Sequence, residues 1–116
     1  MREIKFRCWD KENKEMLDVE YLHWDDCTRE FSIRTTMYSD YFDTEDMILM
    51  QYTGLKDKNG TEIYEGDRVY IIPEDEYGEV EWDIESARFI VVYDDVMTDF
   101  DNWNRKDLEV VGTIYD

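Results

Sequence analysis

The 116-residue chain contains little proline, glycine, cysteine or histidine, and no long apolar run. One proline and five glycines leave no composition for a low-complexity linker. No window of about eighteen uncharged apolar residues is present, and the N-terminus lacks the apolar core of a signal peptide. These absences speak against a membrane span or an export signal, so we expect the protein in the cytoplasm of the cell that makes it.

The single His23 and the two cysteines, Cys8 and Cys27, supply little material for a metal site or a nucleophile. Their spacing matches no zinc motif. We predict two buried or half-buried thiols in a reducing compartment, and no disulfide is indicated. Cys27 lies near His23, but a Cys/His nucleophile also needs an orienting group and an oxyanion site, which nothing marks. We therefore expect a protein that is not an enzyme, with no cofactor and no metal.

Positive charge is scarce as well, because the chain contains 13 Lys and Arg but 31 Asp and Glu, which gives a formal net charge of −18. Residues 1–60 hold 14 acids and 9 bases, whereas residues 61–116 hold 17 acids and 4 bases. Such a surface repels nucleic acid phosphates and anionic membranes. We expect no direct nucleic acid binding and no membrane contact.

Aromatic and β-branched residues are abundant, with 16% of the chain aromatic and 42% hydrophobic, enough for the core of one domain. Residues 3–9 alternate between polar and apolar, which predicts a half-buried strand that returns through residues 16–19. Residues 21–24 and 30–33 form a second strand pair around the turn Asp25-Asp26-Cys27-Thr28. Residues 35–46 are a polar connector with room for a short helix, and residues 48–52 begin the second half.

The segment from Met50 to Val69, MQYTGLKDKNGTEIYEGDRV, carries the strongest turn signals. Asn59-Gly60 predicts a hairpin with a type I′ turn, which needs positive φ at both central residues. Glu65-Gly66-Asp67 predicts a further turn before a β-branched strand over residues 68–72.

Three more strands are predicted at residues 79–85, 88–93 and 108–115. Between the last two, the spacing of the apolar residues in 94–105 favours a helical turn packed on the rest of the fold. Short, evenly spaced strands are typical of a small, partly open barrel. We expect Phe6, Trp82, Phe89 and Ile114 in its core.

The segments MREIKFRCWDKENKEM, MQYTGLKDKNGTEIYEGDRV and LEVVGTIYD together resemble the YopX family of small bacteriophage and prophage proteins. The resemblance implies a mostly-β fold within one domain, with N-terminal β-hairpins over 1–46 and an SH3-like, partly open barrel over 47–116. It also implies a bacterial host cell and no established activity. The family supplies no catalytic residues, and the chain departs from its usual pattern most clearly over residues 73–104.

Calcium binding is an alternative use for the acids. An EF-hand loop requires glycine at its sixth position, but in Asp57-Lys58-Asn59-Gly60 the glycine is the fourth residue. We therefore interpret this segment as a hairpin turn. The acids of the 94–101 loop are able to gather a cation adventitiously, but a solvated acidic face is the simpler interpretation. Those acids are Asp94, Asp95, Asp99 and Asp101.

The remaining candidate site is the segment EVEWDIE. As a strand it places Val80, Trp82 and Ile84 inward and four carboxylates in one outward row, about 6.8 Å apart. The row consists of Glu79, Glu81, Asp83 and Glu85. It offers a basic protein groove a surface like that of a nucleic acid backbone. A charged outer face that protects a strand edge from aggregation is the plainer explanation.

Two functional hypotheses follow. In the first, the chain is a non-catalytic accessory module whose barrel binds a host or phage protein. In the second, it is an acidic mimic of nucleic acid that inhibits a host DNA-processing or defence protein. High salt discriminates between them, because an electrostatic complex weakens steeply while a desolvated aromatic contact does not. A homo-oligomer is compatible with both.

Overall fold

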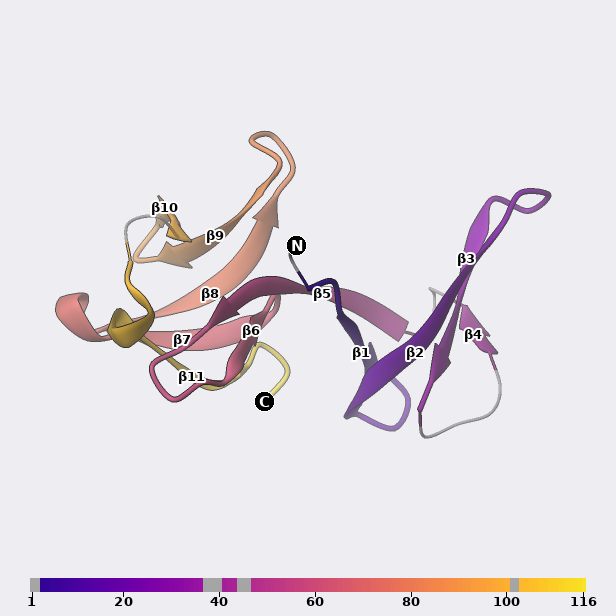
Figure 1. The fold of residues 1–116 in the computed structure, drawn as a ribbon, viewed down its shortest axis with the longest axis horizontal. Coiled ribbons are helices and arrows are strands. Elements are labelled where there is room, and N and C mark those ends of the chain that lie inside the picture. The colour runs from indigo at the N-terminus through magenta and orange to yellow at the C-terminus, as the bar shows by residue number, and fades with distance from the viewer. Residues whose placement is uncertain (1–2, 37–40, 44–46, 101–102) are drawn as a thin grey trace. The chain divides into compact units, whose positions relative to one another are not determined.

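The computed structural model describes residues 3–36, 41–43, 47–100 and 103–116 (Figure 1). Antiparallel β-strands make up most of the fold, so the mostly-β prediction is confirmed. Only short 3-10 turns interrupt the strands, among them η1 (Ile72–Glu74) and η3 (Arg105–Asp107). The strands are β1 (Phe6–Asp10), β2 (Glu15–Asp25), β3 (Glu30–Thr35), β4 (Tyr41–Asp43), β5 (Met47–Lys56), β6 (Glu62–Tyr64), β7 (Asp67–Ile71), β8 (Glu76–Asp83), β9 (Arg88–Tyr93), β10 (Val96–Asp99) and β11 (Leu108–Thr113).

The chain divides into two compact units, with Ile4–Gln51 in one and Tyr52–Asp116 in the other. In the first unit the strands lie in the order β4-β3-β2-β1-β5. Alternation in β1 and β2 brings Cys8 opposite Leu17, and both are buried together with Ile33 and Met47. The predicted strand pair is confirmed, but β2 is one strand of 11 residues with a register shift between Val19 and Tyr21.

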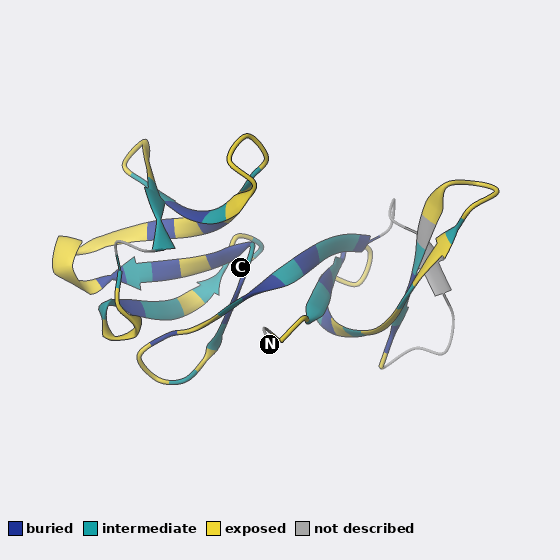
Figure 2. Ribbon diagram, turned by 45° about the horizontal axis from the view of Figure 1, so that its top comes forward, coloured by how far each residue is buried: buried dark blue, intermediate teal, exposed yellow. Residues whose placement is uncertain are grey.

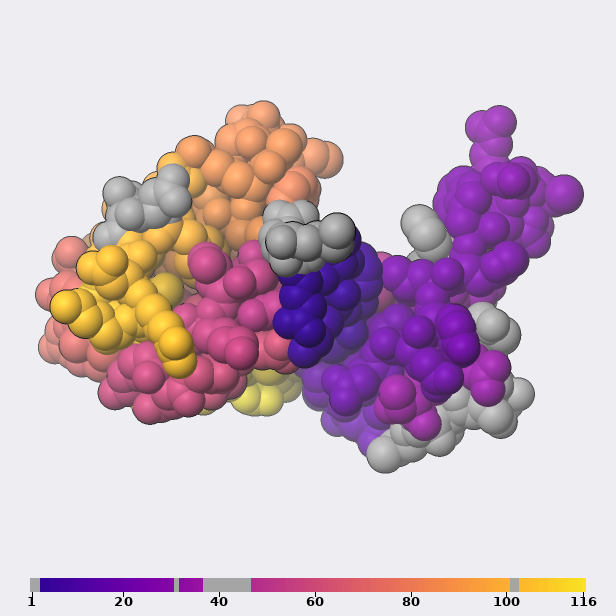
Figure 3. All heavy atoms as spheres, in the orientation of Figure 1, coloured from indigo at the N-terminus to yellow at the C-terminus, as the bar shows by residue number. Residues whose placement is uncertain are grey.

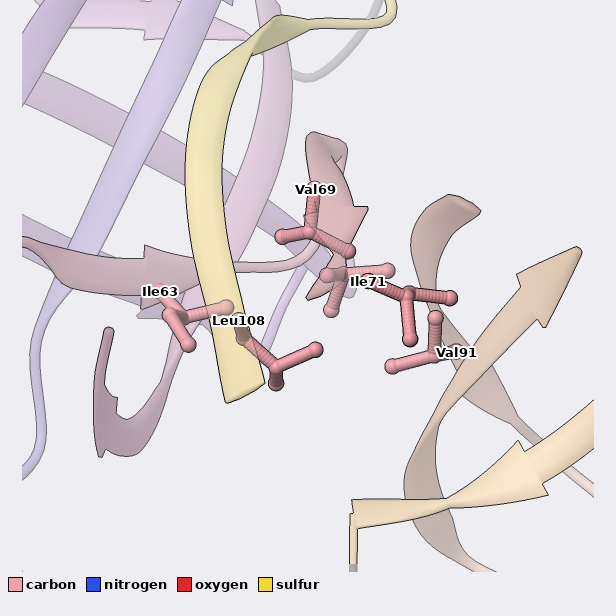
Figure 4. Packing of buried hydrophobic residues seen from close by; sticks show 6 residues of the cluster. Ile63, Val69, Ile71, Val91 and Leu108 are labelled. Atoms are coloured by element: carbon pink, nitrogen blue, oxygen red, sulfur yellow. The ribbon is translucent and has the colours of Figure 1, made fainter. Parts of the chain in front are cut away.

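The second unit contains a five-stranded sheet in the order β10-β9-β8-β7-β11. Its core is formed by β-branched and leucine side chains from five strands, which converge in Figure 4. They are Ile63, Val69, Ile71, Val80, Val91 and Leu108. β10 and β11 are the two edges of this sheet and do not pair with each other, so the barrel predicted for the C-terminal half is not confirmed.

The hairpin between β5 and β6 forms at the predicted Asn59-Gly60, but its turn type differs from the prediction. Gly60 has a φ of 83°, whereas Asn59 is not among the residues with positive φ. The Gly60 N–H donates to the Asp57 carbonyl at 3.1 Å, and the Asp57 N–H donates to the Thr61 carbonyl at 2.9 Å. This is a type I turn followed by a left-handed glycine, which is the usual three-residue hairpin loop.

A type I′ geometry occurs instead between β9 and β10, where Asp94 and Asp95 have φ of 47° and 60°. Aspartate tolerates this left-handed conformation better than most residues. The predicted helical turn over 94–105 is therefore wrong at its start, because Val96–Asp99 is strand β10. In 35–46, residues 41–43 form strand β4 rather than a helix, and residues 37–40 and 44–46 lie outside the described residues.

The cysteine and core predictions are each only partly correct. Cys8 is fully buried, and burial, with the charges of Asp10 and Asp18, raises the pKa of its thiol to about 11. Cys27 is exposed in the turn after β2, so its predicted burial is wrong. Phe6 is half-buried, but Ile114 is 44% exposed and lies outside the core.

Candidate partner-binding surface

The predicted acidic strand belongs to a β-hairpin that extends beyond the sheet. β8 pairs with β7 only as far as Glu79, which lies opposite Arg68, and β9 pairs with β10 only as far back as Ile90. Beyond those points, within the part of the chain that the structure describes, β8 and β9 pair only with each other, down to the pair Asp83 and Arg88. This two-stranded segment, residues 81–89, is called the acidic hairpin below, and it projects from the sheet in Figure 1.

Two predicted core residues are exposed because the acidic hairpin lies beyond the core. Val80 is 1% exposed, but Trp82 on the same face is 46% exposed and Ile84 in the turn is 83% exposed. Trp82 packs edge-to-face on half-buried Phe89, with ring centroids 4.9 Å apart. The prediction of Trp82 and Ile84 as inward-facing is therefore wrong, as the exposed surface of this hairpin in Figure 2 shows.

The strand register itself is the predicted one. On β8, Glu79 and Glu81 are exposed while Val80 is buried, so the alternation is not shifted by one residue, although β8 ends at Asp83 rather than at the predicted Glu85. Trp82 is exposed because none of the described strands covers that part of the hairpin.

Only three of the four acids of the predicted row are exposed carboxylates. Asp83 is held in the turn, where its Oδ1 accepts the Glu85 N–H at 3.2 Å and its Oδ2 accepts the Ser86 hydroxyl. The Ser86 hydrogen bond lowers the pKa of Asp83 the most, and the Glu85 N–H and the Arg88 charge add to it, which together outweigh the opposing effect of burial. Glu79, Glu81 and Glu85 remain as exposed carboxylates of the segment.

Basic residues near the acidic hairpin are few. Arg68 lies opposite Glu79 on the neighbouring strand. Arg88 is engaged elsewhere, because its Nη1 lies 2.6 Å from Oδ2 of Asp99. The face therefore combines exposed carboxylates with exposed apolar side chains and little compensating positive charge.

Several aspartates far from this hairpin have structural roles. Asp10 accepts the backbone N–H groups of Glu12 and Asn13, and Asp25 accepts those of Cys27 and Thr28, as the Asx-type turn predicted for Asp25 requires. Part of the acidic excess thus stabilises turns and needs no partner to explain it.

Asp57 is the most deeply integrated of these aspartates. It is 1% exposed, and its Oδ1 accepts the N–H groups of Asn59 and Thr61, both at 2.9 Å. Its Oδ2 accepts the N–H of Val110 on β11 at 2.8 Å. Burial raises the pKa of Asp57, but these three N–H donors and the charge of Arg105 together outweigh it and hold that pKa below its usual value. Both carboxylate oxygens of Asp57 thus serve the hairpin turn and its connection to β11.

No group of three or more His, Cys, Asp or Glu side chains is arranged to hold a metal ion among the described residues. His23 is exposed on β2 and Cys27 is exposed in the turn that follows. No helix within the described ranges is long and apolar enough to cross a membrane.

Comparison with known proteins identifies the same family as the three sequence segments that resemble it. The family described as YopX protein matches residues 5–116. The chain belongs to the YopX family. No curated protein matches it.

Among solved structures, the YopX chain is similar to protein EF1440 from Enterococcus faecalis, at 28% sequence identity and a TM-score of 0.68. The similarity covers 99% of this chain and 95% of that one. The relative's crystal structure thus supports the mostly-β fold of this chain.

Proposed function

We propose that this YopX protein is a non-catalytic protein-binding module of a phage or prophage, acting in the bacterial cytoplasm. Its partner is a host or phage protein with a basic surface. The observation that carries the proposal is the acidic hairpin, where Trp82 and Ile84 are exposed between Glu81 and Glu85 with no strand beside them. In this view the C-terminal sheet is the scaffold that presents the hairpin.

The physical roles of the two kinds of side chain differ. A net charge of −18 attracts a basic partner over a distance of about one Debye length and speeds encounter. Exposed aromatic and aliphatic side chains supply affinity once they are desolvated in the complex. A partner with an apolar pocket inside a basic rim satisfies both.

Mimicry of nucleic acid is the second candidate, and the exposed Glu79, Glu81 and Glu85 favour it. Two observations weaken it. Asp83, the third acid of the row, is occupied by its own turn, and Arg68 lies opposite Glu79. A mimic also has no need for an exposed Ile84.

The test compares three variants in quantitative affinity capture from a bacterial lysate. Ile84→Ser removes the apolar anchor without changing charge. Glu79→Gln, Glu81→Gln and Glu85→Gln together remove three charges. The matched control removes the same number from exposed positions of the other unit, through Glu12→Gln, Glu20→Gln and Glu30→Gln.

We expect one basic protein that wild type and the control capture, that Ile84→Ser loses and that the Gln variant retains weakly. Loss with the Gln variant alone, together with release at 0.5 M salt, would support nucleic acid mimicry instead. Identical capture by all four proteins would refute a role for the hairpin. Turnover in a panel of nucleotide and phosphoester substrates would refute the non-catalytic part.

A further inference from the structure

A second surface of the C-terminal unit has the opposite character to the acidic hairpin. A cavity of about 270 Å³ lies between β5, β6, η3 and the start of β11. Leu55, Ile63, Phe100, Trp103 and Leu108 form its apolar walls. Trp103 is half-buried and contacts Tyr93 edge-to-face, with ring centroids 6.1 Å apart, so the aromatic wall is backed by packed side chains. A volume of this size suits one bulky side chain.

Basic side chains gather at the same place. Lys56, Asn104 and Arg105 complete the lining of the cavity. A more open hollow of about 470 Å³ adjoins it, sharing Asn104 and Arg105 and adding Lys58 and Lys106. Residues 52–116 contain six Lys and Arg, and four of them are at this site, although the chain as a whole is strongly acidic. In Figure 3 the gold atoms near residue 105 lie against the magenta atoms of the β5–β6 segment.

Arg105 is fixed in position by the Asp57 turn. Its Nε donates to the Asp57 carbonyl at 2.8 Å. A side chain on Gly60 would bring a Cβ within 3.3 Å of Nη2 of Arg105, so the glycine leaves room for the guanidinium group. No described residue accepts a hydrogen bond from the remaining guanidinium N–H groups, which suit a carboxylate in the two-pronged manner that arginine favours.

Of the acids near the pocket that the structure describes, Glu62 lies opposite Lys56 in the β5–β6 pairing, and the others are already engaged. The Asp57 carboxylate accepts three backbone N–H groups, Asp107 accepts the Asn104 N–H at 2.9 Å, and Glu109 pairs with Lys58 at 3.4 Å. Lys56 and Lys106 are exposed and form no ion pair within the described ranges. The site therefore keeps cations available for a ligand.

We propose that this pocket binds a peptide segment in which a bulky apolar residue is followed by carboxylates. The apolar side chain enters the cavity between Phe100 and Trp103. The carboxylates lie over Arg105 and Lys106. The buried indole N–H of Trp103 has no acceptor in the described part of the chain, and a peptide carbonyl that reaches it completes that hydrogen bond. The proposal is independent of the acidic hairpin and its partner.

The test uses two-dimensional ¹⁵N–¹H spectra of the labelled full-length protein, where the indole signal of Trp103 is assigned by its loss in Trp103→Phe. Amidated peptides ending in Phe-Glu-Glu, Phe-Gln-Gln and Ala-Glu-Glu are titrated to millimolar concentration. A peptide ending in Phe with a free terminal carboxylate distinguishes a chain end from acidic side chains as the source of the anion. We expect the Trp103 signal to shift with the Phe-Glu-Glu peptide and not with Phe-Gln-Gln, Ala-Glu-Glu or the free-carboxylate peptide.

Variants then test the cations without touching Arg105, which also supports the turn. Lys56→Gln combined with Lys106→Glu is expected to raise the dissociation constant about tenfold. Arg68→Glu, a charge change in the same unit but away from the pocket, is the matched control and is expected to change it less than about twofold. Equal shifts with Phe-Gln-Gln and Phe-Glu-Glu, equal weakening by both variants, or no shift with any peptide would overturn the proposal. Variants of Ile84 and Glu79 leave this binding unchanged, so failure here and failure of the hairpin proposal are separable.

Discussion

Replacement of Asp57 is expected to destabilise the C-terminal unit more than replacement of any exposed acid. Its carboxylate joins the β5–β6 turn to β11 through bonds to Asn59, Thr61 and Val110, the last of which is 53 residues away in the sequence. Its carbonyl also holds Arg105. The Asp57 side chain thus connects the β5–β6 turn to β11, and the Asp57 backbone carbonyl adds η3 to them.

The expected loss for Asp57→Ala is about 3 to 5 kcal/mol. Hydrogen bonds to a charged group contribute roughly 1.5 to 3 kcal/mol each, and a buried donor left without an acceptor costs about 1 to 3 kcal/mol. The Val110 N–H is part-buried, so water replaces the carboxylate poorly there, whereas the Asn59 and Thr61 N–H groups are in an exposed turn and recover part of the loss. Asp57→Asn keeps the shape but presents an NH₂ group to an N–H donor, and we expect about 2 to 3 kcal/mol.

The pH dependence follows from the lowered pKa of Asp57. A carboxyl group whose folded pKa is below its unfolded value of about 3.9 stabilises the folded state fully above that value and loses the contribution as the pH falls through the folded pKa. The difference in unfolding free energy between wild type and Asp57→Asn should therefore be constant near neutral pH and shrink below about pH 4.

Urea denaturation followed by tryptophan fluorescence measures these changes as a shift in the midpoint at constant slope. Asp26→Asn, at an exposed acid of the β2–β3 turn, is the control and should lie within about 0.5 kcal/mol of wild type. A loss below about 1 kcal/mol for Asp57→Ala, or a difference that grows in acid, would refute the reasoning.

Three further outcomes are expected. At pH 8, Ellman's reagent should react quickly with Cys27 alone and reach Cys8 only after unfolding, because Cys8 is buried with a pKa of about 11; two fast thiols would contradict this burial. Trp82→Ala should cost about 1 to 2 kcal/mol in urea denaturation, less than the roughly 3 to 5 of a buried tryptophan, and a larger loss would mean that the hairpin is covered. Asp94→Asn with Asp95→Gly should raise the free energy of unfolding by about 0.5 to 1 kcal/mol in thermal melts, since Asn-Gly suits a type I′ turn, and destabilisation would contradict that geometry.

Features that depend on a few neighbouring residues are those that the sequence predicted well. The alternation around Cys8 produces β1, and the position of Gly66, with a φ of 87°, marks the turn before β7. Asp25 caps its turn because its side chain reaches backbone groups two and three residues ahead. The turn types were harder to predict, because Asn59-Gly60 fits either of two hairpin loops and Asp94-Asp95 is a less common type I′ pair.

The sequence by itself determined the β-strand content, the positions of most turns, the charge and, through its motifs, membership of the YopX family. Only the tertiary structure decided at which residue each strand stops pairing with its neighbour. The alternation of EVEWDIE is the same whether β7 covers all of it or stops at Glu79, so exposure of Trp82 and Ile84 had no local signal. The meeting of Lys56 with Arg105 and the bond from Asp57 to Val110 likewise depend on contacts across about fifty residues, which strand pairing creates and periodicity does not encode.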